Sequence, residues 1–335
     1  MDLTQDAKLT WAIIGPGNIA RDFIHDMTLV TECKNNVVAV MSNDLGEAEA
    51  FATAYHIPYF FNSIQKMLDL ASPDIVYIST PHAAHFSQAL ECLQRHIAVL
   101  CEKPMTLNLE QVTALIETSK ANRTFLMEGM WIRFLPSIGQ VLELLRHNMI
   151  GEINSIVADM SYLAPEDAEN RFYNPELGGG SLLDLGIYPV YLALLILGLP
   201  RLIKTTSLLS SDGIDKSCAI IAEYADSAYA ILESSIIKKT GKKAHIYGDK
   251  GCITILEPWN EKPAGILVSF YDGTSAKYPC EWEGRGFQFE IAEVIHCLSS
   301  HRIESDLHNH MESFRLIGLL DEIRSQANIV YPSYE

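Results

Sequence analysis

Basic residues are scarce in this sequence. Its 335 residues include 25 lysines and arginines against 42 aspartates and glutamates, which gives a formal net charge of −17. A chain this acidic lacks the positive field that attracts phosphate polymers and anionic membranes, so a function in nucleic-acid or membrane-surface binding is disfavoured. A basic pocket for one small anion is still compatible with this charge.

Cysteine pairs and long apolar runs are also missing. The seven cysteines are scattered and form no C-x-x-C pair, which argues against a disulfide framework or a structural zinc site and suits a reducing compartment. The longest apolar run, around residues 191–199, is well short of the roughly 20 residues of a membrane span. The first eight residues are polar and acidic, unlike a secretory or transit peptide. We therefore expect a soluble cytoplasmic protein.

The sequence does contain enough apolar residues for two cores, since 48% of its residues are hydrophobic and the chain is longer than a usual single domain. In residues 1–129, short apolar runs alternate with amphipathic stretches, which predicts a doubly wound parallel sheet. Residues 130–335 predict an α+β domain with a large, mostly antiparallel sheet, one face of which needs cover. The strands predicted in this part are 153–162, 217–224, 229–237, 244–247, 252–256 and 266–271.

A glycine motif stands between the first predicted strand and the helix after it. It reads Gly15-Pro16-Gly17-Asn18-Ile19-Ala20. The first glycine permits a tight turn, the second lets the backbone approach a pyrophosphate, and the helix N-terminus supplies amide donors. This position predicts a dinucleotide site. A glycine turn without a ligand is the alternative.

The choice between NAD and NADP is made at the end of the second predicted strand. The sequence there is Met41-Ser42-Asn43-Asp44. Asp44 could bind the ribose hydroxyls of NAD. Ser42 could accept the 2′-phosphate of NADP, although it lacks the usual adjacent arginine. These residues alone leave both cofactors open.

A lysine follows another buried strand, in the motif Glu102-Lys103-Pro104. Ligands of open α/β sheets bind at such strand ends. Partial desolvation there would lower the pKa of Lys103 and suit it to proton transfer or to polarising a carbonyl. A solvated lysine without a catalytic role is an equally good interpretation of this motif by itself.

A second glycine-rich segment precedes a long apolar helix, predicted over 182–197. Gly178 to Gly180 permit close approach of the backbone to a ligand. Asp184 and Tyr188 are four residues apart, so both project from one helical face, where a carboxylate and a phenol can orient a hydroxyl and relay its proton. The alternative is an acid favoured by the helix dipole and a tyrosine of the core.

Taken in order, these motifs resemble a known family. Gly15–Ala20, Ser79–His85, Glu102–Pro104 and Gly178–Tyr188 are similar in order and spacing to the Gfo/Idh/MocA family of glucose–fructose oxidoreductase and inositol dehydrogenase. The segment Met127–Pro136 resembles the branch that contains dimeric trans-dihydrodiol dehydrogenase and NADP-dependent D-xylose dehydrogenase.

This resemblance implies a Rossmann domain joined to an open-faced β-sheet domain whose sheets often pair in dimers. It implies hydride transfer between nicotinamide and a hydroxyl carbon of a small cyclic sugar, polyol or trans-dihydrodiol. Lys103 matches the family lysine that contacts the reacting oxygen, and Asp184 matches the aspartate of the second motif. Tyr188 stands where most of the family has histidine, as in the dihydrodiol branch, which favours Tyr188 as the acid/base assisted by Lys103.

The resemblance also supplies a set of site residues. Cofactor contacts are expected from Gly15, Gly17, Asn18, Ile19, Ser42, Asn43, Thr80, Pro81, His85, Glu102 and Lys103. Substrate contacts are expected from Trp131, Tyr162, Asp184 and Tyr188. The branch usually carries serine–arginine after the second strand, so Asn43 departs from it, and NADP is only weakly preferred over NAD.

Three further expectations complete the interpretation. No metal is expected, because hydride transfer needs none and the histidines lack ligands at useful spacing. The chain is expected to form a homodimer or a higher homo-oligomer through the sheet of its second domain. The alternative function is a non-catalytic NAD(P)-binding sensor or regulator, which would have no chemical need for Lys103, Asp184 and Tyr188 together.

Overall fold

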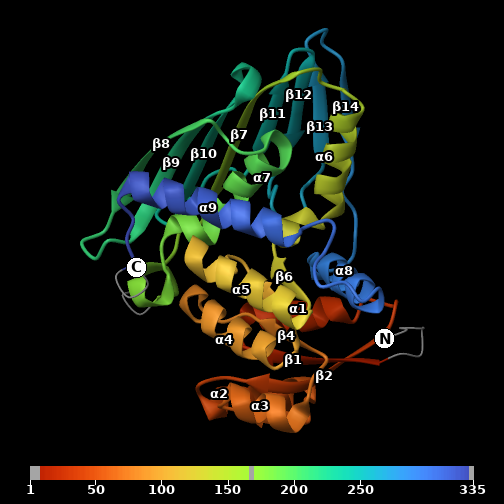
Figure 1. Cartoon of the computed structure of the whole chain (residues 1–335). Helices are drawn as coiled ribbons and strands as arrows, with labels where there is room; N and C mark the ends of the chain where they lie inside the picture. The colour runs from red at the N-terminus through yellow and green to blue at the C-terminus, as the bar shows by residue number, and fades with distance from the viewer. Residues whose placement is uncertain (1–7, 166–169, 332–335) are drawn as a thin grey trace. The chain divides into compact units, whose positions relative to one another are not determined.

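Six parallel strands form the first sheet, in the order β3-β2-β1-β4-β5-β6 (Figure 1). The computed structural model describes residues 8–165 and 170–331. Strand β4 is buried at every residue, as expected for a parallel sheet covered on both faces. The predicted doubly wound parallel sheet is confirmed. The strands are β1 Lys8–Ile14, β2 Lys34–Met41, β3 Tyr59–Phe61, β4 Ile75–Ile78, β5 Ala98–Glu102 and β6 Leu126–Gly129.

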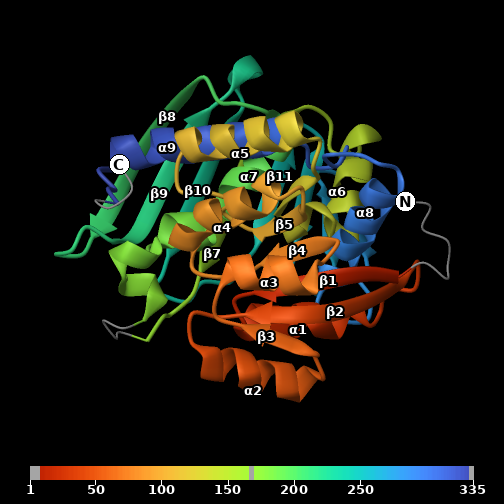
Figure 2. The ribbon, with the colours of Figure 1, turned by 60° about the horizontal axis from the view of Figure 1, so that its bottom comes forward.

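Helices cover both faces of this sheet. Right-handed crossovers place α1 and α2 on one face and α3, α4 and α5 on the other. Figure 2 shows α2 and α3 on opposite sides of the edge formed by β2 and β3. The helices are α1 Asn18–Met27, α2 Leu45–Tyr55, α3 Ile64–Ala71, α4 His82–Gln94 and α5 Leu109–Asn122.

Residues Glu283–Phe314 belong to the same unit as Met1–Trp131, although the sequence analysis placed them in the second domain. The buried carboxylate of Asp26 on α1 accepts three successive backbone N–H groups at the start of α8 (Phe287–Ser299), at 2.8, 2.8 and 3.0 Å. These contacts join residues about 260 positions apart. Local sequence patterns carry no signal for an anchor of this kind.

Eight strands form the sheet of the second unit, Ile132–Trp282 with Arg315–Glu335. Their order is β14-β13-β12-β11-β7-β10-β9-β8. Neighbouring strands are antiparallel except β7 and β10, which are parallel. The predicted mostly antiparallel sheet is confirmed. The strands are β7 Ile153–Ser161, β8 Leu202–Leu209, β9 Asp215–Glu223, β10 Tyr229–Ser235, β11 Ala244–Gly248, β12 Gly251–Ile255, β13 Ile266–Phe270 and β14 Ser275–Tyr278.

The helices of this unit include a short π-helical turn, Leu182–Gly186, which leads directly into α7. By length and composition alone, the stretch Pro175–Leu197 could cross a membrane, but 83% of its apolar window is buried inside the structure. A helix in the core of a folded protein is also apolar on all sides, because all of its sides are buried. The remaining helical segments of the described chain are α6 Pro136–Arg146, α7 Ile187–Leu197, α9 His310–Ala327, whose first residues belong to the first unit, and single 3-10 turns at Trp131–Arg133, Arg171–Tyr173, Pro175–Leu177 and Ala225–Ser227.

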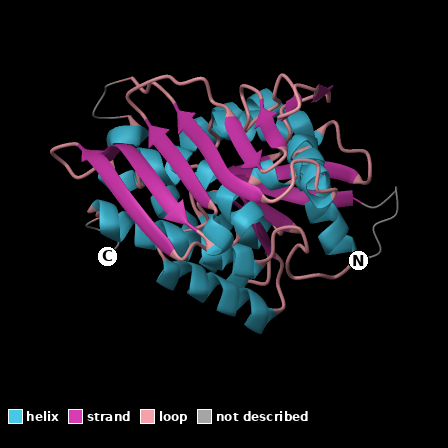
Figure 3. Ribbon diagram, turned by 90° about the horizontal axis from the view of Figure 1, so that it is seen from above, coloured by secondary structure: helices cyan, strands magenta, loops and turns pink. Residues whose placement is uncertain are grey.

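The eight-stranded sheet has one open face, onto which Figure 3 looks. On β9 and β10, side chains alternate between the two faces. Ala222, Ala230 and Leu232 are buried on the helix-covered face, whereas Ile221 and Ile231 lie opposite each other on the open face, 47% and 43% exposed. Within the part of the chain that the structure describes, no helix covers this face.

Candidate functional site

The turn after β1 packs tightly against the turn after β4. Gly15 has φ +94°, and a Cβ atom there would lie 2.8 Å from the Ser79 carbonyl carbon and the Thr80 nitrogen. The Ser79 hydroxyl donates a hydrogen bond to the Gly15 carbonyl at 2.9 Å. Only glycine fits both the backbone angle and this close approach.

Gly17, in contrast to the tightly packed Gly15, faces open space. A Cβ at this position would find nothing within 4 Å. Gly17 is the N-cap of α1 and offers no side chain to its first-turn amides, and Asn18 and Ile19 beside it are exposed. An open glycine before an uncapped helix N-terminus suits a pyrophosphate. The turn therefore fits a dinucleotide.

The end of β2 carries acidic rather than basic groups. Ser42 is buried and donates its hydroxyl to Glu47 Oε2 at 3.0 Å. The Asp44 carboxylate caps α2 by accepting the N–H groups of Gly46 and Glu47. Asn43 is exposed. Asp44 thus already has a structural role, and sequence reasoning missed Glu47, whose position is set by the first turn of α2.

His85 is fully buried between two backbone carbonyls. Its ring nitrogens lie 2.8 Å from the Pro104 oxygen and 2.8 Å from the Thr80 oxygen. Burial lowers the pKa of His85 to about 4, so the ring is neutral near pH 7 and donates from one nitrogen. His85 joins the turn after β4, with Thr80 and the exposed Pro81, to the loop after Lys103.

Lys103 is half-buried at the end of β5, and its loop is held by two acidic side chains, the half-buried Glu102 and the buried Glu128. The Glu102 carboxylate accepts the Lys103 backbone N–H at 3.2 Å and the Tyr77 hydroxyl at 2.7 Å. The Met105 N–H donates to Glu128 Oε1 at 2.9 Å. The peptide between Lys103 and Pro104 is cis.

Glu128 is itself paired with His308, and both side chains are fully buried. Their Oε2 and Nε2 atoms are 3.1 Å apart. Burial opposes the charge on His308, but hydrogen bonds to Glu128 and Glu312 outweigh it and raise its pKa. This pair supports the Lys103 loop from behind. Nothing in the local sequence could have linked residues 180 positions apart.

In the second unit, Asp184 lies in the π-helical turn and forms an ion pair with Arg171. The Arg171 nitrogens are 3.1 and 3.3 Å from the two carboxylate oxygens. The Asp184 side chain is 6% exposed and that of Arg171 is 47% exposed. The Arg171 guanidinium also lies over the Phe172 ring, 4.4 Å from its centroid. Sequence reasoning missed Arg171, because it stands outside the glycine motif.

Tyr188 is buried in the first turn of α7. The turn before it approaches β10 so closely that a Cβ at Gly186 would lie 2.9 Å from the Ser234 hydroxyl oxygen. The exposed Tyr162 packs against Phe172, with ring centroids 5.4 Å apart. Asp184, Arg171 and this aromatic pair thus gather on one side of the second unit, while Lys103 belongs to the first.

Trp131 ends the first unit. Its ring packs on Phe287, with centroids 5.1 Å apart. Its buried indole N–H has no hydrogen-bond partner within residues 8–165 and 170–331. A buried donor without a partner is costly in a folded protein, so it is a candidate for contact with a bound molecule.

The histidines show no metal-site geometry in the described residues, among which no three His, Cys, Asp or Glu side chains are grouped to hold an ion. The rings of His82 and His85 are 5.8 Å apart and edge-to-face. His310 Nε2 lies 3.0 Å from the Leu126 carbonyl. His85 and His310 thus contact backbone carbonyls.

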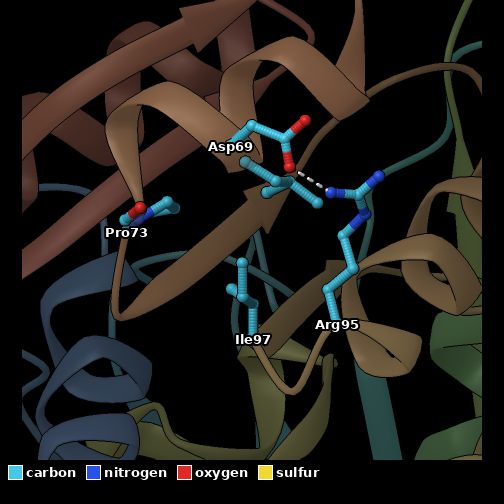
Figure 4. A pocket seen from close by; sticks show the side chains of 6 residues that line it. Asp69, Pro73, Arg95 and Ile97 are labelled. Atoms are coloured by element: carbon cyan, nitrogen blue, oxygen red, sulfur yellow. Dashed lines mark hydrogen bonds and ion pairs between the residues drawn. The ribbon is translucent and has the colours of Figure 1, made fainter.

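A surface pocket of about 410 Å³ lies near the amino-terminal ends of the strands of the first sheet, opposite the ends that carry the glycine turn (Figure 4). Pro73 and Ile97 stand just before the amino ends of β4 and β5, and Arg95 points toward Asp69, with which it forms an ion pair. Ligands of open α/β sheets bind at the carboxyl ends of strands. The pocket is therefore separate from the nucleotide site. Its lining residues are Leu68, Asp69, Ser72, Pro73, Arg95 and Ile97.

Comparison with known proteins decides the family. Residues 9–130 match the model of the oxidoreductase family with an NAD-binding Rossmann fold, and residues 138–254 match the Gfo/Idh/MocA C-terminal domain. The chain belongs to the Gfo/Idh/MocA oxidoreductase family. The predicted family is confirmed, and with it an NAD(P)-dependent dehydrogenase.

Full-length relatives of this Gfo/Idh/MocA protein support the predicted branch. It is 31% identical over 333 residues to a trans-1,2-dihydrobenzene-1,2-diol dehydrogenase of Xenopus tropicalis, covering 96% of this chain and 99% of the relative. The enzyme of the same name from Homo sapiens is 28% identical over 340 residues, covering 97% and 98%. The dihydrodiol dehydrogenase branch is therefore confirmed.

Solved structures share the fold of this Gfo/Idh/MocA chain at low sequence identity. The aldose-aldose oxidoreductase from Caulobacter crescentus, complexed with glycerol, has a TM-score of 0.87 at 21% identity. KijD10, a 3-ketoreductase from Actinomadura kijaniata in complex with NADP and TDP-benzene, has a TM-score of 0.86 at 21% identity. Each comparison covers 96% of this chain and 98% of the other. At this identity the likeness concerns the fold alone.

Proposed function

We propose that this chain transfers a hydride between nicotinamide and a hydroxyl-bearing carbon of a small cyclic sugar, polyol or trans-dihydrodiol. One observation carries the proposal. Lys103 follows β5 and the open Gly17 turn follows β1. Both therefore lie at the carboxyl-terminal ends of the parallel strands of the first sheet, two strands apart. The full-length relatives are named for a cyclic diol, which supports this substrate class.

The glycine turn holds the cofactor in this proposal. Gly15, Gly17, Asn18 and Ile19 bind the pyrophosphate through backbone amides, because that is what an uncapped helix N-terminus offers. Thr80, Pro81 and Glu102 line the same edge, and His85 fixes the loops behind it. When bound, the nicotinamide ring accepts or donates the hydride.

Lys103 and Tyr188 handle the proton. In oxidation, the phenolate form of Tyr188 accepts the proton of the substrate hydroxyl and becomes the phenol, and in reduction the phenol gives its proton to the carbonyl oxygen. The Lys103 ammonium donates a hydrogen bond to the same substrate oxygen and stabilises the negative charge that develops on it. Asp184 orients this group of side chains, with its charge balanced by Arg171.

The substrate ring lies against aromatic side chains in this proposal. The unpartnered indole N–H of Trp131 donates to a substrate hydroxyl. Tyr162 and Phe172 offer an apolar surface beside the Arg171–Asp184 pair. Rings with several hydroxyls match this combination of one flat apolar side and a few polar groups.

For the cofactor we propose NAD, against the weak preference for NADP drawn from the resemblance. The segment 41–47 contains no basic residue, and its end carries the Glu47 carboxylate on Ser42. A carboxylate there accepts a ribose 2′-hydroxyl and repels a 2′-phosphate. The cation to weigh against this is Arg21, whose guanidinium lies 5.6 Å from the Phe51 ring centroid on α2.

The open face of the second sheet supports the proposed homodimer. Ile221, Tyr229 and Ile231 expose between 43% and 47% of their surface on adjacent strands, and Leu202 and Leu208 on β8 are exposed as well. Exposed apolar side chains gathered on one sheet face, here with the Lys204–Glu223 ion pair among them, are typical of an interface. A second copy of the chain is the occupant that the predicted pairing of sheets requires.

The cysteines support the proposed cytoplasmic location. All seven are free, and five of them are buried. Unpaired thiols persist in a reducing compartment.

The direct test is turnover. Purified protein is incubated with NAD or NADP and a panel of aldoses, inositols and cyclic trans-diols, and absorbance of the reduced nicotinamide is followed. We expect turnover with at least one cyclic substrate. Tight cofactor binding without turnover on any panel member would instead support the regulator and contradict the proposed reaction.

A further inference from the structure

Asp215, the first residue of β9, is fully buried against the second glycine motif. Its Oδ2 atom accepts the Ser181 hydroxyl at 2.8 Å and the Leu182 backbone N–H at 2.7 Å. These residues immediately precede and begin the π-helical turn that contains Asp184. Neither the sequence motifs nor the proposed mechanism makes use of Asp215.

The glycines of the motif leave room for this carboxylate. Gly180 has φ +110°, and a Cβ there would lie 2.1 Å from Asp215 Oδ1. The carbonyl of the neighbouring Gly179 accepts a hydrogen bond from the Tyr331 hydroxyl at 2.9 Å. The Gly178–Gly180 stretch is thus held by Asp215 and by the chain after α9. Gly180 is therefore explained by the close approach of the Asp215 side chain of the same protein, rather than by that of a ligand.

The contact between Asp215 and Leu182 gives a hydrogen-bond partner to a backbone N–H at the start of the helical segment. The first amides of a helical segment have no partner within it, and Ser181, the N-cap here, makes no side-chain cap. Asp215 caps the segment from another strand. A β10 residue joins the same network, since the Ser234 and Ser181 hydroxyls are 2.9 Å apart. The position of the π-helical turn is therefore set by the sheet beneath it.

We propose that Asp215 is a positioning residue that fixes the segment from Leu182 to Tyr188 for catalysis. This inference rests on the proposed function in that Tyr188 handles the proton. Tyr188 lies six positions after Leu182, and the chain between them passes through one π-helical turn and the start of α7. A shift of about 1 Å in a catalytic group can cost roughly 10²-fold in rate.

Because one carboxylate oxygen of Asp215 has no hydrogen-bond partner in the part of the chain that the structure describes, Asp215→Asn is a matched control for Asp215→Ala. Asp215 Oδ1 has no hydrogen-bond partner among the described residues, so both bonds use Oδ2. Asp215→Asn can keep an oxygen in that position and accept both donors. Asp215→Ala removes the acceptor. Ser181→Ala removes one donor and leaves the Leu182 bond, which makes it the milder variant if Asp215→Ala does not fold.

The first readout is steady-state kinetics of the full chain. We expect Asp215→Ala to lower kcat by about 10- to 100-fold, Ser181→Ala to lower it less, and the Kd for reduced cofactor to change by less than about twofold, because the cofactor is held by the first unit. Asp215→Asn should recover kcat to within about threefold of the wild type. If the folded Ala and Ser181→Ala variants keep the wild-type kcat, Asp215 does not position the site.

The second readout needs no turnover. Hydrogen exchange of the peptide that covers residues 178–188 should be faster in Asp215→Ala and Ser181→Ala and unchanged in Asp215→Asn. Unchanged exchange in the first two variants would overturn the positioning role even in an active enzyme. Faster exchange in a protein whose wild type shows no dehydrogenase turnover would support the anchor while contradicting the proposed function. The two failures are thus distinguishable.

Discussion

Arg171 and Asp184 are joined by a two-point ion pair in which a half-exposed guanidinium meets a nearly buried carboxylate, with nitrogen–oxygen distances of 3.1 and 3.3 Å. The arginine comes from a 3-10 turn ahead of the glycine motif and the aspartate from the π-helical turn after it. A burial this uneven means that Asp184 depends on Arg171 for its charge balance far more than the reverse.

Arg171→Ala should therefore impair the site. Without the guanidinium, the buried Asp184 carboxylate loses its two-point partner, and we expect kcat/KM to fall about tenfold or more. Arg171→Lys keeps the charge but not the fork geometry, so its loss should be smaller. Steady-state kinetics on the best substrate of the panel measure both. Identical kcat/KM values for Arg171→Ala and wild type would show that the pair has no part in the reaction.

Lys103→Met and Tyr188→Phe test the proton-handling groups. Each removes the polar atom and preserves much of the side-chain volume, and we expect turnover to drop by about two orders of magnitude or more. The Kd for reduced cofactor, measured by fluorescence, should stay near the wild-type value. Tyr229→Phe, on the open sheet face, is the matched control and should be fully active. Near-normal turnover in either site variant refutes the role of that residue.

Glu47 should decide the cofactor. In Glu47→Gln the carboxylate is gone, so repulsion of a 2′-phosphate is relieved, and we expect the ratio of the NADPH and NADH dissociation constants to fall by about tenfold. Glu49→Gln, an exposed position on the same helix, controls for net charge. The binding constants are measured by nicotinamide fluorescence without substrate.

Two outcomes contradict the preference for NAD. One is wild-type protein that binds NADPH more tightly than NADH. The other is Arg21→Gln that weakens NADPH binding alone, which would assign the 2′-phosphate to that cation.

Asp215 should make stability depend on pH. Burial raises its pKa from 3.8 to about 7, so the folded state binds a proton that the unfolded state releases above its own pKa. Stability from this group is thus complete below pH 3.8 and is lost as pH rises through about 7. Cys218, on the same strand, has its pKa raised to about 12 by burial and does not titrate in this range.

The comparison is with Asp215→Asn, which lacks this ionisation. Between pH 5 and pH 8, wild type should lose on the order of 2 kcal/mol of unfolding free energy relative to the variant. Urea denaturation at the two pH values measures the difference. A gap between the two proteins that is the same at both pH values would show that Asp215 has an ordinary carboxyl pKa.

Ile231→Glu should separate the subunits. A charge among the exposed apolar side chains of β9 and β10 cannot be buried without a partner, so we expect the mass measured by light scattering after gel filtration to fall to that of one chain. Leu70→Glu, at an exposed leucine of α3, should leave the mass unchanged. A wild-type chain that is monomeric at high micromolar concentration would contradict the proposed dimer.

The sequence by itself determined the fold class and the nucleotide turn, because both depend on local patterns. Alternating apolar runs and helices specify a parallel sheet, and the spacing of Gly15 and Gly17 between a strand and a helix is a motif contained within one turn. Three strands were not predicted from the sequence: β3 lies at an edge of the first sheet, and β8 and β14 lie at the edges of the second. Edge strands such as Leu202–Leu209 bury one side poorly and so show a weak apolar alternation.

Only the tertiary structure revealed the partners of the site residues. Arg171 on Asp184, Glu47 on Ser42, His308 on Glu128 and Asp215 on Leu182 are contacts between different elements, and their energy comes from burial that a one-dimensional pattern does not contain. The same holds for Glu283–Phe314, which the buried carboxylates of Asp26 and Glu128 bind to the rest of the first unit. A sequence names the groups capable of chemistry, whereas packing decides which charges are balanced and which atoms are held in place.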